Sequence, residues 1–445
     1  MPEVTFILPA VGKKPNEKYL RSWKMEPLMI ATLKALTPPE WRTRFFDDRL
    51  ELIDYDIDTD LVAITVETYT ARRAYGIAER FRRRGIPVVM GGYHPTLVPE
   101  ETARYADAVV VGNAEESWPQ VLADVRNGGL KPRYEGIGGM TGIVPDRSIF
   151  AGKRYLPIGL VETGRGCPFH CEFCAITTYY DARYHQKPVD AVVEDIRRSG
   201  RRLFFFADDN IVANTDYLRQ LCRALKPLNI RWSAQGTLTI ARRPDLLAEM
   251  KASGCDLLLV GFESLDEANL AQMGKEWSLK LGQRDELVQR IHDAGISIYA
   301  TFVFGFDNDT AATFEESLTF ALRHRFFYAA FNHLLPFPGT PLYARLAAED
   351  RLLRPHWWLD DDYTYGEIAF RPRNMAPREL SERCAHARRQ FFRLRNIGRR
   401  SLNLLRTRPS LPVYLTYWTS NLTLKREVDG RLGLPVGDGL EALPK

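Results

Sequence analysis

Two successive series of short apolar runs, most of them followed by a helical pattern, fill most of the chain and constrain its fold. In the first series the runs have the length of strands, and continuous apolar runs are typical of strands buried on both faces. Strands that alternate with helices form a parallel sheet covered by helices on both faces. Residues 1–130 are therefore predicted to form a doubly wound α/β domain of the Rossmann or flavodoxin type. The expected strands lie at 4–8, 43–47, 60–66, 86–92 and 106–112, and the expected helices at 27–36, 71–85 and 114–129.

The second series begins at residue 158 and contains six strand-like runs with helical patterns between them. Six strand–helix units are too few for a full eight-fold barrel, so residues 158–345 predict a (βα)6 partial TIM barrel. The chemistry of such a barrel is expected at the carboxyl ends of its strands, on the loops. The six runs lie at 158–166, 201–210, 230–238, 255–264, 297–306 and 326–340.

The remaining segments differ in composition from both series. Residues 131–157 are rich in Gly, Pro and Arg, which predicts a linker between the two domains. Residues 346–445 carry a strongly basic helical pattern at 377–405 and predict a helical C-terminal domain. A chain of 445 residues is long enough for two or three such domains.

The net charge, the N-terminal segment and the length of the apolar runs indicate the compartment and the kinds of partner to expect. The net charge of +5 is modest for this length and does not argue for nucleic acid. The N-terminus resembles a buried strand rather than a signal peptide, and no apolar run is long enough to span a membrane. We therefore expect a cytoplasmic protein with reduced thiols. In that setting clustered cysteines favour metal binding or catalysis over disulfides.

Half of the six cysteines lie in one short segment, "GRGCPFHCEFCAITTYY", as Cys167, Cys171 and Cys174. Thiolates hold iron–sulfur clusters, and three of them on one loop would leave the fourth iron of a cubane cluster open. A structural zinc site, the main alternative, needs four ligands, and only His170 stands nearby. A catalytic thiol would not need three cysteines. Cys222 and Cys255 lie in apolar contexts and are expected to be inert core residues.

The C-x3-C-x2-C spacing, with Phe173 before the last cysteine, resembles the radical S-adenosylmethionine superfamily. Further motifs of that superfamily follow in the expected order over residues 155–345. They are "ADDN" at 207–210, "GFES" at 261–264, "FVFGFDND" at 302–309 and "PFPGTPLY" at 336–343. The last of these is common in the subgroup that also has a cobalamin domain.

The resemblance implies that Cys167, Cys171 and Cys174 bind a [4Fe-4S] cluster, whose open iron binds S-adenosylmethionine. One electron would then cleave this cofactor to methionine and a 5′-deoxyadenosyl radical, which abstracts hydrogen from the substrate. No residue is named as catalytic. Strand-end caps, core hydrogen bonds and aromatic packing explain several of the expected cofactor contacts equally well. Those contacts are Phe173, Asp208, Asp209, Gln235, Thr237, Glu263, Ser264 and Phe304.

The N-terminal domain resembles the cobalamin-binding domain of class B radical enzymes, chiefly over residues 88–101 and 106–122. Gly91, Gly92 and His94 are the expected contacts to the corrin or its tail. A tight turn explains the glycines as well, and a ring satisfied within its loop explains the histidine. The D-x-H-x-x-G motif that supplies a histidine to cobalt is absent, so no cobalt ligand is named.

The combined resemblance implies a cobalamin-dependent radical enzyme, most directly a C-methyltransferase similar to hopanoid methylases. Methylcobalamin would deliver its methyl group to the substrate radical. The alternatives are a radical cyclase, desaturase or other hydrogen-abstracting enzyme with the N-terminal domain as scaffold, and a non-catalytic iron–sulfur or corrin sensor. A methylthiotransferase is disfavoured, because no cysteine precedes Cys167.

The expected partners follow from the same resemblance. They are a small-molecule or lipid substrate and an electron donor such as flavodoxin or ferredoxin, without nucleic acid. The basic helical pattern at 377–405 most simply packs on the barrel, but it also suits peripheral contact with an anionic membrane.

Overall fold

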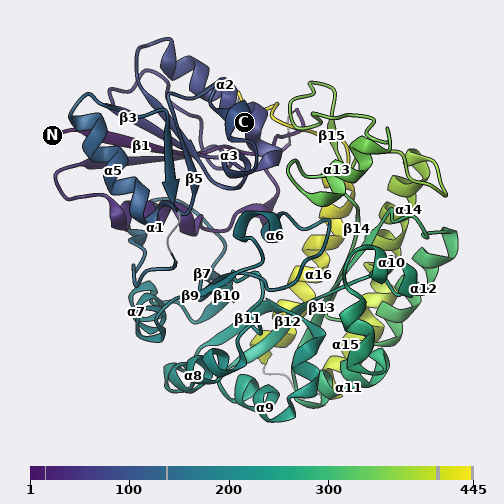
Figure 1. Ribbon diagram of the computed structural model, residues 1–445. Coiled ribbons are helices and arrows are strands. Elements are labelled where there is room, and N and C mark those ends of the chain that lie inside the picture. Colours follow the sequence, from purple (N-terminus) through teal and green to yellow (C-terminus); the bar gives the residue numbers. More distant parts are fainter. Residues whose placement is uncertain (16, 137–138, 407–410, 442–445) are drawn as a thin grey trace.

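The computed structural model contains two six-stranded parallel sheets, and it describes residues 1–15, 17–136, 139–406 and 411–441. Figure 1 shows the N-terminal sheet with its helices at one end of the molecule and the curved second sheet beneath it. The expected linker and C-terminal domain each include residues outside the described ones, namely 137–138 in the first and 407–410 and 442–445 in the second.

The N-terminal sheet has the strand order β2-β1-β3-β4-β5-β6, with every neighbouring pair parallel. Helices α1 and α5 pack with one face of the sheet, and α2 packs with the other. This arrangement confirms the predicted doubly wound domain. Its elements are β1 (Glu3–Leu8), α1 (Leu28–Leu36), β2 (Arg42–Asp47), β3 (Leu61–Thr65), α2 (Ala71–Arg82), β4 (Val88–Gly91), α3 (Tyr93–Leu97), α4 (Pro99–Thr102), β5 (Ala108–Gly112) and α5 (Ala114–Arg126).

The start of the expected linker is part of this sheet. Residues Arg133–Gly136 form β6, which pairs in parallel with β5. Tyr134 is the buried residue of this edge strand and packs among the core residues beneath α5. One apolar side chain in four residues is too weak a signal for a strand, which is why the sequence indicated only a loop there.

The second sheet has the order β14-β13-β12-β11-β10-β7 and is also entirely parallel. It is the predicted six-stranded partial barrel, with helices on its outer side (Figure 1). Its strands are β7 (Gly159–Val161), β10 (Leu203–Phe206), β11 (Arg231–Gly236), β12 (Cys255–Glu263), β13 (Ser297–Phe304) and β14 (Tyr328–His333). The helices are α7 (Val189–Ser199), α8 (Thr215–Leu225), α9 (Pro244–Ala252), α10 (Glu267–Gln272), α11 (Arg284–Asp293) and α12 (Ala311–Arg323).

The two faces of the barrel sheet differ in burial. Along β13, the buried residues Ala300 and Phe302 belong to the same hydrophobic core as the outer helices, whereas Tyr299, Thr301 and Val303 between them are partly exposed. The same alternation runs along β11 and most of β12. Because successive strand residues point to opposite faces, the inner face of the sheet is the less buried of the two. We call the region along this inner face the lumen.

The cysteine segment follows β7 through a small antiparallel ribbon. Strands β8 (Gly164–Gly166) and β9 (Tyr184–Gln186) pair with each other, and α6 (Ala175–Tyr180) lies between them in the chain. Figure 1 shows α6 between the two large sheets. The sequence did not reveal this ribbon, because its strands are three residues long and contain two glycines.

The described C-terminal residues include the predicted helices, and they pack against both large sheets. Trp357, Trp358, Tyr363 and Val436 complete the hydrophobic core between α2 and the N-terminal sheet. Helix α16 packs on the barrel, where Ser420 meets the hydroxyl of Tyr328. The elements are α13 (Pro341–Ala348), β15 (Thr364–Tyr365), α14 (Pro377–Phe391), α15 (Leu394–Arg406), α16 (Leu411–Arg431) and β16 (Leu434–Pro435). No described helix is long and apolar enough to cross a membrane.

Candidate cluster and cofactor site

The three clustered cysteines lie on the loop that joins β8 to α6, at the carboxyl end of the barrel. All three are partly exposed, and Cys174 stands directly before the first residue of α6. Burial raises the pKa of each thiol, that of Cys171 to about 12. Without a metal these thiols are therefore protonated at neutral pH, and binding a metal would release their protons.

Two adjacent aspartates anchor the start of this loop. The carboxylate of Asp208 is fully buried and accepts hydrogen bonds from the backbone N–H of Thr163, at 2.7 Å, and from its hydroxyl. Asp209 accepts from the backbone N–H of Gly166, also at 2.7 Å. Burial raises the pKa of Asp208 to about 7 and that of Asp209 to about 6. Asp208 thus supports the loop from below, whereas Asp209 remains partly exposed beside the cysteines.

The far side of the loop is held by other parts of the barrel. Arg345 of α13 pairs with Glu172 at 2.8 Å, and this arginine follows the proline-rich motif that the sequence singled out. Phe169 stacks on Trp277 with their ring centroids 3.9 Å apart. Phe173 makes an edge contact with Phe306. The loop is therefore fixed on both sides before any cofactor binds.

Asn210 reaches the cluster ligands, although the sequence offered no role for it beyond its place in the "ADDN" motif. Its side-chain Nδ2 lies 3.5 Å from Sγ of Cys167. Its Oδ1 is buried and has no hydrogen-bond partner among the described residues. A buried unsatisfied acceptor is costly, so this amide oxygen is suited to a donor that a bound ligand would supply.

Glu263 ends β12 in a strained conformation. Its φ of 62° is in the left-handed region that non-glycine residues rarely adopt, and such strain concentrates at functional sites. Lys275, which is almost fully buried, lies 3.2 Å from one carboxylate oxygen, and the hydroxyl of Thr301 lies 3.4 Å from the other. The charge of Lys275 also acts on the thiol of Cys171, so it connects Glu263 to the cysteine loop.

Two other expected contacts lie on the lumen side of β11. The amide of Gln235 donates to the backbone carbonyl of Asp208 at 3.2 Å, and Gln235 remains partly exposed. The hydroxyl of Thr237 lies 2.7 Å from that of Thr239. Gln235 thus bonds to the backbone beside the anchoring aspartates and also borders the lumen, whereas Thr237 has a partner within its own loop.

Ser264 and Phe304 are placed away from the lumen. Ser264 is buried, and its hydroxyl accepts from the backbone of Asp266 at 3.1 Å. Phe304 is 1% exposed and stacks on Phe314 of α12, on the outer face of the sheet. The alternation along β13 accounts for this position, because Phe304 has the parity of the buried residues. Phe304, expected to contact S-adenosylmethionine, instead packs in the core.

The glycine pair of the N-terminal domain lies at the carboxyl end of β4, partly exposed. Gly92 has a φ of 111°, and a Cβ there would come within 2.9 Å of the carbonyl oxygen of Val66. Only glycine therefore fits this turn without displacing β3. In doubly wound sheets, ligands bind outside these strand ends, at the point where the strand order reverses, here between β1 and β3.

His94, expected to contact the corrin, is instead fully buried. Its Nε2 lies 3.0 Å from Glu101 and 3.1 Å from the hydroxyl of Tyr75, and its Nδ1 lies 3.4 Å from Thr68. Glu101 also accepts from the indole of Trp358. Both ring nitrogens are thus engaged within the protein, which fixes the turn after Gly92 and leaves no ring edge for a ligand.

The turn at the carboxyl end of β4 that contains Gly91 and Gly92, which we call the glycine edge, faces the cysteine loop across the boundary between the two domains. Tyr93, the residue after Gly92, lies 4.9 Å from Tyr179 of α6, measured between ring centroids. Arg165 in the ribbon pairs with Glu115 of α5 at 2.6 Å. Glu67, just beyond β3, is exposed to solvent, yet desolvation by the surrounding protein raises its pKa. Neighbouring protein groups therefore limit the hydration of this carboxylate.

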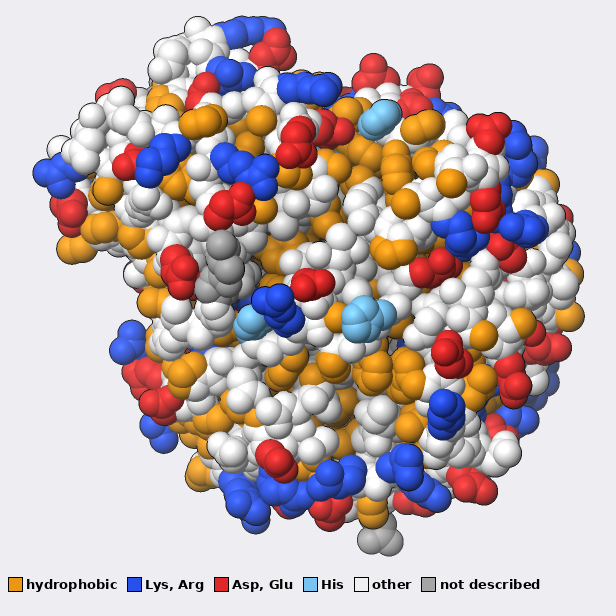
Figure 2. Space-filling model, in the orientation of Figure 1, with side chains coloured by type: hydrophobic (Ala, Val, Ile, Leu, Met, Phe, Trp, Pro, Cys, Tyr) orange, Lys and Arg blue, Asp and Glu red, His pale blue; other side chains and the backbone are white. Residues whose placement is uncertain are grey.

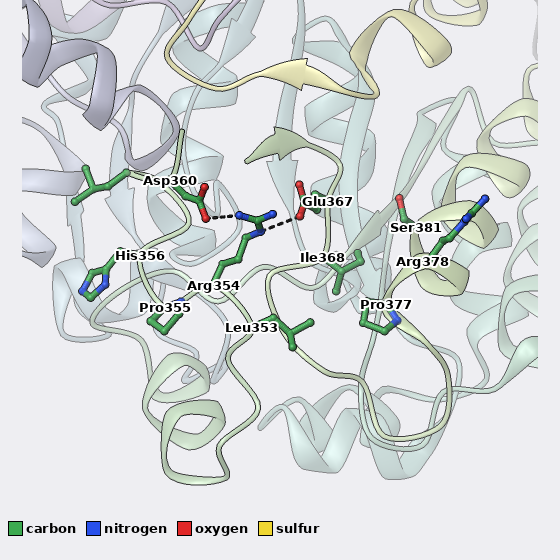
Figure 3. Close-up of a pocket in the computed structure, with 11 residues that line it drawn as sticks. Leu353, Arg354, Pro355, His356, Asp360, Glu367, Ile368, Pro377, Arg378 and Ser381 are labelled. Carbon is green, nitrogen blue, oxygen red and sulfur yellow. Dashed lines mark hydrogen bonds and ion pairs between the residues drawn. The ribbon is translucent and has the colours of Figure 1, made fainter. Parts of the chain in front are cut away.

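The outer surface agrees with this position. On the face drawn in Figure 2, hydrophobic side chains gather in the recess between the N-terminal domain and the barrel, and charged side chains lie mainly around its rim. A separate groove of about 890 Å³ is formed by residues between α13 and α14 (Figure 3). It contains none of the expected site residues. Its central cation, Arg354, is already paired with Asp360 and Glu367, and Arg378 pairs with Glu382.

The donor set of the loop fits an iron–sulfur cluster. Among the described residues, no group of three or more His, Cys, Asp or Glu side chains is arranged to hold a single metal ion. In a cubane cluster each thiolate binds a different iron, so three thiols need not converge on one point. Three thiols on one anchored loop, with the buried Asn210 beside them, meet that requirement.

Comparison with known proteins identifies relatives of both sheets. Residues 161–321 match the Radical SAM superfamily, and residues 41–122 match the B12 binding domain. A bacteriochlorophyllide d C-12(1)-methyltransferase from Chlorobaculum tepidum is 30% identical over 382 residues, covering 82% of each chain. A bacteriochlorophyllide d C-8(2)-methyltransferase from the same organism is 30% identical over 337 residues, covering 71% of this chain and 75% of the relative.

A solved structure has the same fold. The radical S-adenosylmethionine methyltransferase TsrM from Kitasatospora setae, with cobalamin and a [4Fe-4S] cluster bound, superposes with a TM-score of 0.62 at 18% identity. The match covers 80% of this chain and 79% of that protein.

Proposed function

Because the chain belongs to the radical SAM superfamily and carries a B12-binding domain, we propose that it is a cobalamin-dependent enzyme that methylates an unactivated carbon of a small molecule. Both relatives described above are methyltransferases by name. The observation that carries the proposal is the contact between Tyr93 and Tyr179. It brings the glycine edge of one domain against the cysteine loop of the other, so groups bound at the two sites would act on one substrate.

We assign the cluster to Cys167, Cys171 and Cys174. When bound, the cluster and S-adenosylmethionine supply a 5′-deoxyadenosyl radical, which opens a C–H bond of the substrate. The protein contributes a loop that is already fixed by Asp208, Asp209 and Arg345 before the cofactors arrive. Such preorganisation lowers the entropy cost of positioning the reacting groups.

The polar groups closest to the thiols are the proposed contacts to S-adenosylmethionine. Asn210 has an unsatisfied buried oxygen suited to an ammonium donor, and Glu263 presents a carboxylate that is already oriented by Lys275. Asp209, Gln235 and Phe173 remain partly exposed around the same space. Thr237 is kept as a further contact, although its hydroxyl already has a partner, whereas Ser264 is buried and its hydroxyl is engaged within the protein.

Cobalamin is assigned to the glycine edge of the N-terminal sheet. When bound, it supplies a methyl group to the substrate carbon. Gly92 permits the close turn against Val66 that places the backbone of the glycine pair at the strand ends, and His94 holds this turn in place through Glu101. In this assignment His94 positions the site without touching the cofactor.

Three further assignments concern partners and setting. The reaction needs a one-electron donor, for which flavodoxin or ferredoxin is proposed, and a cytoplasmic location would keep the cysteine thiols reduced. No role with nucleic acid is proposed. Peripheral membrane contact is proposed for the end of the barrel near α15 and α16, because Leu394, Leu402, Leu411 and Leu415 are each more than half exposed there. Flotation with anionic vesicles tests this contact, and protein that stays at the bottom of the gradient would refute it.

The function is tested with the reconstituted enzyme under anaerobic conditions. It is supplied with cobalamin, dithionite, S-adenosylmethionine carrying a trideuterated methyl group, and bacteriochlorophyllide d as the first acceptor. The proposal predicts 5′-deoxyadenosine together with an acceptor heavier by one labelled methyl group. Formation of 5′-deoxyadenosine with an oxidised or cyclised acceptor and no label would favour the cyclase or desaturase alternative. If no 5′-deoxyadenosine forms, the alternative that remains is a non-catalytic sensor.

A further inference from the structure

An arginine without an acidic partner lies beside β14, the strand that forms one edge of the barrel sheet and borders the lumen. Arg388 of α14 donates from Nη2 to Oδ1 of Asn332, 3.2 Å away, at the carboxyl end of that strand. Arg383 and Arg389 on the same helix pair with Glu379 and Asp429. Arg388 forms no ion pair with any residue that the structure describes. A partly buried cation without a counter-charge is costly, so it is suited to an anion supplied from outside.

Tyr69 and Tyr299 are within electrostatic reach of this arginine, and Tyr365 contacts Tyr69. Tyr69 follows β3 of the N-terminal sheet, Tyr299 points inward from β13, and Tyr365 belongs to β15. The rings of Tyr69 and Tyr365 lie 5.3 Å apart. Burial raises the pKa of Tyr69 and of Tyr299, and the charge of Arg388 acts on both in the opposite direction. The guanidinium is therefore within electrostatic reach of both phenols, although they come from different domains.

The three hydroxyls are also free to bind a ligand. All three tyrosines are partly exposed, and none of their hydroxyl groups makes a hydrogen bond to a described residue. They are not among the buried polar atoms without a partner, so they are open to a ligand. Together with a guanidinium that has no counter-charge, they offer hydrogen-bond donors from separate segments of the chain.

The groups that act on the phenols of Tyr69 and Tyr299 include no carboxylate. Arg388 acts on both phenols, and Arg431, which also acts on Tyr299, is already paired with Glu427. Burial first, and Arg388 second, lower the pKa of His333 to about 3, so this neighbouring ring is neutral. An anion placed here would meet no repulsion from these groups.

Aromatic side chains provide an apolar wall beside the cation. Tyr69 lies 4.9 Å from Trp357, and Tyr365 lies 5.4 Å from Trp23, measured between ring centroids. A cation without a counter-charge therefore lies beside an apolar wall here. In the groove of Figure 3, by contrast, the two carboxylates drawn beside Arg354 already form ion pairs with it.

We propose that Arg388 and the hydroxyls of Tyr69, Tyr299 and Tyr365 bind an anionic oxygen group, a carboxylate or a phosphate, on an otherwise apolar substrate. This inference rests on the proposed function, because it assigns the lumen to the substrate of that reaction. The cysteine loop follows β7 at one edge of the barrel sheet, and Arg388 adjoins β14 at the other. A substrate held by its anionic end would extend across the lumen toward the loop. The planar fork of arginine suits both anions, because it can bond two oxygens at once.

The test measures binding and does not need turnover. The full-length reconstituted protein is titrated with protoporphyrin IX, which carries carboxylates on an apolar body, and with its dimethyl ester, which does not. Farnesyl phosphate is the phosphate probe. Binding is followed by quenching of tryptophan fluorescence. A charge-assisted hydrogen bond contributes roughly 1.5–3 kcal/mol, so Arg388→Gln should weaken binding of the preferred anion about 10- to 100-fold.

The matched control is Arg389→Gln, which removes the adjacent arginine together with its exposed ion pair. It should leave affinity unchanged. Arg388→Lys should retain part of the affinity, which separates loss of charge from loss of fold, and thermal unfolding of each variant checks the fold directly. Selective binding of protoporphyrin IX over its ester would identify a carboxylate, and selective binding of farnesyl phosphate would identify a phosphate.

Two results would overturn the inference. One is equal binding of the preferred anion to the wild type and to Arg388→Gln, and the other is failure of both anionic probes to bind the wild type. Neither result bears on the radical reaction, because production of 5′-deoxyadenosine is measured separately. Conversely, a protein that binds the anion through Arg388 but forms no 5′-deoxyadenosine would refute the proposed function and leave the binding site standing.

Discussion

The two parallel sheets of this protein have the same number of strands but bury their faces differently. In the N-terminal sheet, all six residues of β1 are buried, so helices or C-terminal residues cover both faces. In the barrel sheet, residues along β13 alternate between buried and partly exposed. The first sheet can therefore bind a ligand only at its edge, where the strands end, whereas the second can also bind one against its inner face.

This difference explains the division of labour that we propose. The edge of the first sheet presents glycines and backbone, which would suit the binding of a large cofactor at the strand ends. The lumen of the second presents side chains from several strands, which suits the recognition of a small substrate. The cysteine loop lies where the two meet, with α6 against α3.

The largest effect is expected from the cysteine loop itself. Cys171→Ala should reduce the iron content of the reconstituted protein from about four atoms per chain to near zero, because two thiolates do not hold a cubane cluster. Production of 5′-deoxyadenosine should disappear with it. Cys384→Ala, at a buried cysteine of α14, is the control and should retain the iron. Iron retained by the Cys171 variant would contradict the assignment.

Neighbouring leucines of β12 test the difference between the two faces. Leu258 is fully buried on the outer face, whereas Leu259 is partly exposed toward the lumen. Leu258→Ala should lower the free energy of unfolding by about 2–5 kcal/mol. Leu259→Ala should lower it by only about 1 kcal/mol. Urea unfolding of both variants measures the difference.

The N-terminal sheet supplies the matched comparison. Phe6 and Ile7 are adjacent on β1 and both fully buried. Replacing either with alanine should destabilise the protein by about 2–5 kcal/mol, with no difference between faces. Equal costs for the two leucine variants would mean that the lumen is filled in solution, and the comparison between the sheets would fail.

Acid should loosen the barrel through His292 of α11. Burial first, and the charge of His324 second, lower the pKa of His292 to about 4. Between pH 6.5 and pH 4 the unfolded chain therefore binds a proton that the folded barrel does not, so stability falls as the pH falls, by at most about 1.4 kcal/mol per pH unit. His292→Leu should reduce this slope. Hydrogen exchange of β12 and β13, compared with β3 and β4, locates the effect, and an unchanged slope would contradict it.

The smallest predicted effect concerns Asn210. Its amide hydrogen bond to Cys167 should raise the reduction potential of the cluster, because hydrogen bonds to ligating sulfur stabilise the reduced state. Asn210→Leu should lower the potential by roughly 40 mV, the one-electron equivalent of about 1 kcal/mol. Asn210→Asp, which places a carboxylate beside the thiolate, should lower it further. A redox titration followed by electron paramagnetic resonance measures both, and identical potentials would remove Asn210 from the site.

The sequence predicted both sheets because apolar runs and helical periods are local signals. It also identified the cysteine loop, since spacing along the chain is visible without a structure. It did not reveal β6, whose four residues carry one apolar side chain, or the burial of Phe304, which depends on strand parity. The network of His94, Glu101 and Trp358 was hidden for another reason. Its members come from segments more than 250 residues apart, and only folding brings them together.

The set of Arg388 and three tyrosines was hidden in the same way. The basic helical pattern suggested a solvated face or a membrane contact. In the structure, however, Arg383 and Arg389 are paired and Arg388 faces the lumen. Arginines close together on one helix therefore differ in their surroundings. The composition of the helix does not show which of them lacks an acidic partner.

The most direct test of the account is a metal count. The protein is produced with cobalamin uptake, its cluster is reconstituted without oxygen, and iron, cobalt and the absorbance spectrum are measured after desalting. The account predicts about four iron atoms and about one cobalt atom per chain, because each sheet contributes its own site. Four irons without retained cobalt would contradict the claim that the glycine edge of the first sheet binds cobalamin and joins the barrel in methyl transfer.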